Sequence, residues 1–126
     1  MKALSIGIAM LIGIMAVIWY GVSYLQSYAA DIECALDGVC SAYDAGDKQA
    51  ALEMIGALKE RADGAHDILC MMIDHAQVAE ADASVLRLEE LCMADDAKAF
   101  HTECRILAAR VRNMYLSEKL SLANVL

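Results

Sequence analysis

Two histidines and two cysteines have the types and spacing that a metal site or a thiol pair requires. His66 and Cys70 are four residues apart, and His101 and Cys104 are three apart, so each pair fits one face of a helix. If those two helices run parallel and side by side, the four side chains form a Cys₂His₂ set, which is zinc chemistry. The same arrangement allows a disulfide between Cys70 and Cys104. We favour a third interpretation, in which the thiols pack as small apolar side chains and no metal or cofactor is bound.

Other patterns that carry catalysis are weak in this chain. Asp74 and His75 are adjacent, but neighbouring helical residues point about 100° apart, so a role at a helix end is expected rather than a proton relay. The glycines are isolated, and three of them lie in the apolar N-terminal run, unlike a phosphate-binding loop. A formal charge of −8 argues against a nucleic-acid partner. We therefore expect a protein that is not an enzyme.

The N-terminal part of the chain fits a membrane span. Residues 3–22 are almost wholly apolar, and a helix of about 20 residues covers about 30 Å, the hydrocarbon thickness of a bilayer. Trp19, Tyr20 and Tyr24 gather at the end of this run, where aromatic rings prefer the level of the lipid headgroups. Residues 1–30 are predicted to be a transmembrane anchor with a juxtamembrane segment, and residues 31–126 a helical bundle.

The flanks of the span predict its orientation. Lys2 precedes the span and acidic residues follow it, so the N-terminus is expected in the cytoplasm and the bundle outside the cell membrane. A cleaved signal peptide is the alternative, because Ser27-Tyr28-Ala29 offers small residues to a signal peptidase. The apolar run is longer than the usual about 7–15 residues of such a peptide, which favours an uncleaved anchor.

Small residues recur at every fourth position of the span, at Ser5, Ala9 and Gly13. This spacing lets two membrane helices approach closely. Because small residues are common in membrane helices in general, contact with a protein partner through this stripe is a secondary expectation.

Apolar residues at spacings of three and four, with no proline, predict four helices. The first covers residues 3–43, softened at Gly38, and a turn follows with Gly46 in the left-handed region and Asp47 as the next cap. The second covers residues 48–77, and either a bend at Gly64 or a tilted bundle is needed to accommodate its length. The third begins at Val78, and the fourth begins after a break at residues 94–96. The fold class is all-α, an N-terminal transmembrane helix that continues into a short antiparallel helical bundle.

Each helix is expected to turn one apolar stripe toward the bundle core. On the fourth helix, the charged residues Lys98, Glu103, Arg105, Arg110 and Arg112 are expected to face outward. The predicted core positions are Leu25, Ile32, Leu36, Val39, Tyr43, Ala51, Ile55, Leu58, Ala62, Ala65, Leu69, Met72, Ala76, Val78, Ala81, Val85, Leu88, Cys92, Ala97, Phe100, Cys104, Leu107, Val111 and Met114.

Three short segments carry a resemblance to a known family. They are Ile73-Asp74-His75, Leu86-Arg87-Leu88 and the closing stretch of residues 118–126, which begins Glu-Lys-Leu-Ser-Leu. With the N-terminal span and the helical hairpins, they make the chain similar, over nearly its whole length, to the small single-span membrane proteins grouped as domain of unknown function 4363. The resemblance implies a membrane-anchored helical module and implies no activity.

Three functions are compatible with these features. We favour a non-enzymatic module that docks to a membrane or envelope protein partner through the span or the bundle. A metal-binding or thiol-redox module built on His66, Cys70, His101 and Cys104 is the alternative. A ligand-sensing bundle is a third, weakened because the expected cytoplasmic side holds only one or two residues.

Overall fold

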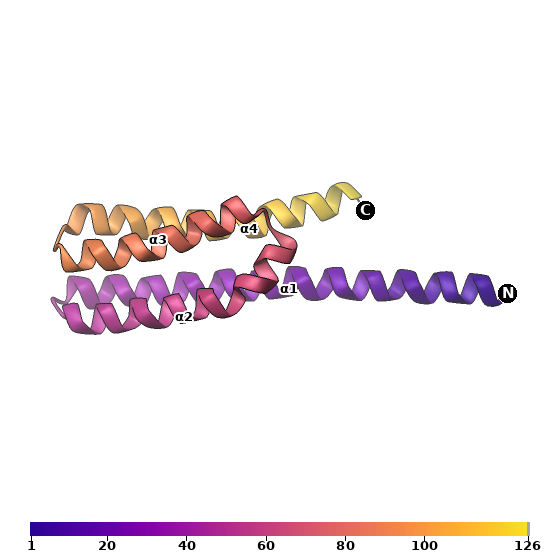
Figure 1. Cartoon of the computed structure of the whole chain (residues 1–126), viewed down its shortest axis with the longest axis horizontal. Helices are drawn as coiled ribbons and strands as arrows, with labels where there is room; N and C mark the ends of the chain where they lie inside the picture. Colours follow the sequence, from indigo (N-terminus) through magenta and orange to yellow (C-terminus); the bar gives the residue numbers. More distant parts are fainter. Residues whose placement is uncertain (126) are drawn as a thin grey trace.

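Figure 1 shows the computed structural model, an antiparallel four-helix bundle from which the first half of one helix protrudes. The structure describes residues 1–125. Its helices are α1 (Lys2–Asp44), α2 (Lys48–Met72), α3 (His75–Met93) and α4 (Ala97–Val125). Each helix packs mainly on the helices before and after it, and α4 closes the ring onto α1, so α2 and α4 lie diagonally across the bundle. The predicted all-α fold is confirmed.

The helix α1 runs without interruption for 43 residues, and its two halves differ in exposure. Its first half is exposed, and its buried positions begin only at Leu25. From there they recur with helical spacing through Val39, which is the apolar stripe that packs on α2 and α4. The predicted rod is confirmed, and Gly38 does not break it.

Two turns, α1–α2 and α3–α4, lie at the end of the bundle opposite the N-terminus, and helix caps stabilise both. Gly46 has φ of 80°, which only glycine adopts readily, and the Asp47 carboxylate accepts a hydrogen bond from the Ala50 amide at 3.1 Å. At the neighbouring turn, the Asp96 carboxylate accepts from the Ala99 amide at 3.2 Å. The Lys48 Nζ donates to the Met93 carbonyl oxygen at 2.8 Å and so joins the two turns.

The boundary between α2 and α3 differs from the prediction. The helix α2 ends at Met72 rather than at residue 77, and Ile73 is extended with φ of −121° and ψ of 151°. Asp74 then caps α3, because its carboxylate accepts from the Ala76 amide at 3.3 Å. Ile73 is itself buried, so the apolar spacing passes through the break without a visible change. Gly64 lies inside a continuous helix.

The predicted core is largely confirmed, with exceptions near the ends of the helices and at Glu103 on α4. Ala76 and Ala97 are exposed, while Tyr43 and Met72 are half-buried. Glu103, which was expected to face outward, is buried against α3. Phe100 is fully buried and stacks on Tyr43 with ring centroids 4.2 Å apart, which seals the core where α4 begins.

Candidate functional site

The protruding half of α1 exposes an almost continuous run of large apolar side chains. The run extends from Leu4 to Tyr20, except that Ile18 is half-buried, and Trp19 is 75% exposed. Among the described residues, α1 is the one helix that is long and apolar enough to cross a membrane, although a signal sequence has the same features. Soluble monomers rarely expose a contiguous apolar patch of more than a few hundred Å², so a surface of this kind marks a contact with something else.

The three aromatic residues predicted at the membrane interface have different surroundings. Trp19 and Tyr20 are exposed near the end of the protruding half. Tyr24 is half-buried, and the Arg61 guanidinium of α2 lies 5.8 Å from the centre of its ring. The same guanidinium lies 5.0 Å from the ring of the buried Tyr28. Tyr24 therefore also serves the packing of α1 on α2.

The small residues of α1 lie on its free half. Ser5, Ala9 and Gly13 are exposed, and a Cβ added at Gly13 would meet nothing within 4 Å. At 3.6 residues per turn, this stripe lies on a different side of α1 from Leu25 and Ile32, which face the bundle. The stripe is thus accessible from outside the bundle.

The four predicted metal or disulfide residues lie in two separate pairs. On α2, the Cys70 Sγ is 3.6 Å from Nε2 of His66, whose Nδ1 is 3.3 Å from Asp82 of α3. On α4, His101 and Cys104 lie against α1 instead. The two pairs belong to the diagonal helices α2 and α4, and all five cysteines are unbridged. Within residues 1–125, no three His, Cys, Asp or Glu side chains are grouped so that they could hold a metal ion.

The neighbour of Cys104 is Cys40, a residue that the sequence did not single out as its partner. Both line an open pocket of about 380 Å³ between α1 and α4, together with His101. The His101 Nε2 lies 2.9 Å from an Asp44 carboxylate oxygen. Burial raises the pKa of the Cys104 thiol above its usual range, and the hydrogen bond with Cys40 is the second largest cause of this shift. A thiol held protonated in this way is a poor nucleophile.

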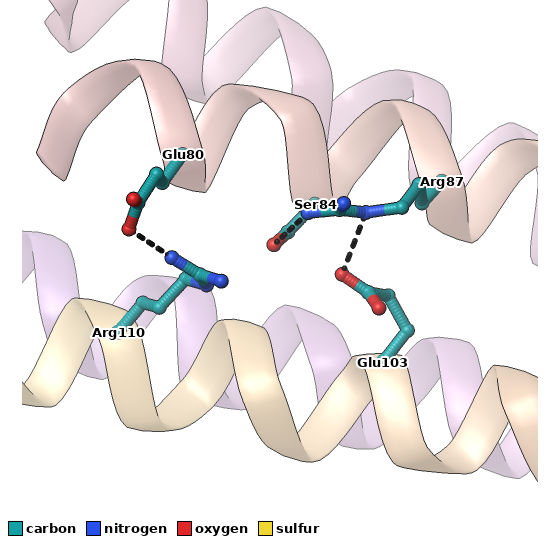
Figure 2. A network of polar contacts seen from close by, with 5 residues as sticks. All are labelled: Glu80, Ser84, Arg87, Glu103 and Arg110. Carbon is teal, nitrogen blue, oxygen red and sulfur yellow. Dashed lines mark hydrogen bonds and ion pairs between the residues drawn. The ribbon is translucent and has the colours of Figure 1, made fainter. Parts of the chain in front are cut away.

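A polar network joins α3 to α4 (Figure 2). The Arg87 Nε of α3 donates to the Glu103 carboxylate of α4 at 3.2 Å, and its second guanidinium nitrogen reaches the buried Ser84 hydroxyl at 3.5 Å. About two turns nearer the start of α3, Glu80 pairs with Arg110 of α4. Ser84 is paired with a cation and not with a base, so the network has the chemistry of a helix interface rather than of an activated nucleophile.

These features define a class of protein: a four-helix bundle that carries an exposed apolar helix at its N-terminal end. Over residues 19–125 the chain matches the family described as a domain of unknown function, DUF4363. The chain belongs to this family, which confirms the resemblance seen in the sequence. No curated protein and no solved structure matches the chain.

Proposed function

We propose that the protein is a non-enzymatic, membrane-anchored module whose helical bundle docks to a protein partner at the cell membrane. The observation that carries this proposal is the division of α1. One unbroken helix is apolar and largely exposed over its first half, and over its second half it is one of the four helices of the bundle. Because the helix is continuous, whatever holds residues 3–22 also fixes the position of the bundle.

Retention of the anchor is supported by the packing of α1. Cleavage after Ala29 would remove Leu25 and Tyr28, which are 1% and 4% exposed in the core. Loss of buried side chains of this size costs about 2–5 kcal/mol each. A chain cut at that site would lose part of its core, which favours the uncleaved anchor over the signal peptide.

For topology, we propose a cytoplasmic N-terminus and a bundle outside the membrane. Lys2 lies on the N-terminal side of the span, whereas Asp31, Glu33 and Asp37 follow it. Positive residues are retained on the cytoplasmic side of a span, and acidic residues contribute little to its orientation. The single lysine is the basis of this assignment.

The alternative of a metal or thiol-redox module has less support. His66 with Cys70 and His101 with Cys104 belong to diagonal helices and have separate neighbours. Burial keeps the Cys104 thiol protonated, which is the opposite of what a redox-active cysteine needs. We therefore assign these residues to packing.

Affinity purification of the intact chain from detergent-solubilised membranes tests the docking function. The proposal expects a protein partner in roughly equal amount to the chain. Gly13→Leu, which fills the exposed stripe of small residues, is expected to reduce the recovered partner if the span contributes to docking. Gly7→Leu is the matched control, because Gly7 is equally free of contacts and lies on the opposite face of α1. A chain that is recovered alone in every detergent contradicts the docking function.

A further inference from the structure

The last turn of α2 packs directly on α1 at the end of the apolar run. A Cβ built on Gly21 would lie 2.8 Å from Cε of Met72, so a side chain larger than that of glycine would displace this methionine. The Met72 side chain therefore packs directly on the α1 backbone at Gly21. The contact fixes the end of α2 relative to residues 17–21.

Beside this contact lies an open apolar pocket of about 490 Å³. Val17, Ile18 and Tyr20 of α1 form one wall, and Ile68 and Met71 of α2 form the other. Met71 is 83% exposed, so its side chain extends beyond the bundle rather than into it. Glu118 of α4 is the charged residue of the lining.

The depth of this pocket in a membrane follows from the helix that carries it. If residues 3–22 cross the hydrocarbon core, residues 17–22 occupy its outer about 8 Å, since a helix rises 1.5 Å per residue. Side chains that contact Val17, Ile18 or Gly21 lie at that same depth. The protruding half of α1 and the turn between α2 and α3 are at the same end of the bundle, as Figure 1 shows.

We infer that Ile68, Met71 and Met72, which we call the α2 rim, form a second lipid contact beside the span. The rim enters the interfacial zone of the bilayer, and acyl chains fill the pocket between it and α1. Glu118 lines the same pocket, and its side chain is long enough to turn its carboxylate from there toward the headgroups, where charged groups keep their water. This inference rests on the proposed membrane anchor and adds that the bundle lies against the membrane rather than standing away from it.

Tryptophan fluorescence of the full-length chain in lipid vesicles tests the inference. Trp19 is the one tryptophan of the chain, so Trp19→Phe gives a silent background for a single probe. Met71→Trp places the probe on the α2 rim. Met93→Trp is the matched control, because Met93 is 55% exposed at the opposite end of the bundle, where α3 ends. Each variant is reconstituted in vesicles whose acyl chains carry bromine near the headgroup, and is also titrated with aqueous acrylamide.

The inference expects brominated lipid to quench the probe at position 71 several-fold more than the probe at position 93, while acrylamide shows the reverse order. Equal lipid quenching at both positions, with Trp19 of the unmodified chain still quenched, overturns the α2 rim and leaves the anchor intact. A probe at position 71 that neither quencher reaches indicates that protein, such as a second copy, covers the rim, and this also overturns the inference. If brominated lipid fails to quench Trp19 itself, the membrane anchor is wrong and the rim contact is wrong with it.

Discussion

At the scale of single residues, the cysteines differ in burial. Cys34 is exposed on α1, whereas Cys104 is buried between α4 and α1. Burial and the hydrogen bond with Cys40 hold the pKa of the Cys104 thiol above the ordinary value of 9.0. The thiolate is the reacting species, so the burial of Cys104 and its raised pKa both lower the reactivity of this thiol.

The raised pKa of the Cys104 thiol predicts a pH dependence of stability. A thiol whose pKa is higher in the folded chain than in the unfolded one stabilises the fold fully below pH 9, and this contribution is lost as the pH rises above about 9. Cys104→Ser is expected to flatten the fall of the free energy of unfolding above pH 9. Denaturant unfolding of the full-length chain in detergent, at a series of pH values, compares this variant with the unmodified chain. An equal slope in the variant and the unmodified chain would contradict the burial of Cys104.

The sequence could place the cysteines on helices but could not pair them. Cys92 and Cys104 fall on apolar stripes, and both are buried as expected. The proximity of Cys40 to Cys104 depends on α1 packing beside α4, which no spacing within one helix reveals. The hypothesis that joined Cys70 to Cys104 required their two helices to lie side by side, whereas α2 and α4 are diagonal in the bundle.

At the scale of the elements, the contact of α3 with α4 depends on buried polar groups as well as on apolar packing. Glu103 has a side chain that is 11% exposed, and its partner Arg87 is 50% exposed. The free-energy cost of removing the partner is therefore different for the two charges. A buried carboxylate left without its cation pays its desolvation cost, whereas a half-exposed guanidinium can turn to water.

Substitutions at this pair are expected to have unequal effects. Arg87→Ala, which leaves Glu103 and Ser84 without their donor, should lower the free energy of unfolding by about 1–3 kcal/mol. Glu103→Ala should cost less than about 1 kcal/mol, and the exposed Arg105→Ala should stay within about 0.5 kcal/mol. Denaturation monitored by circular dichroism measures the three values. The reverse order of Arg87→Ala and Glu103→Ala would show that the pair does not hold α3 on α4 in this way.

Periodicity predicted the elements better than their ends and their charged faces. The stripes on α1 and α3 match the buried residues closely, because a four-helix bundle demands that spacing. The end of α2 was predicted at residue 77 instead of Met72. The extended residue Ile73 is buried, so the apolar pattern continues through the break. Glu103 was placed outside because a charged residue is usually solvated, and its partner Arg87 lies 16 residues away on another helix.

At the scale of the whole molecule, α1 joins its exposed apolar half to the bundle without a flexible link. Its exposed half and its buried half belong to one continuous helix, and α4 extends past the turn between α2 and α3 toward the same end of the molecule (Figure 1). With residues 3–22 across a membrane, as proposed above, the bundle would keep a fixed height and orientation relative to the bilayer. The architecture therefore suits a module that presents one particular face to a neighbour at the membrane.

The retained membrane anchor is the central claim, and alkaline extraction of membranes tests it most directly. Membranes from cells that express the full-length chain are washed with carbonate at high pH, and the chain is mapped by mass spectrometry in the pellet and in the supernatant. The account predicts that the chain stays in the pellet and that peptides from residues 3–30 are recovered with it. A chain that appears in the supernatant, or one that begins after Ala29, would contradict the account.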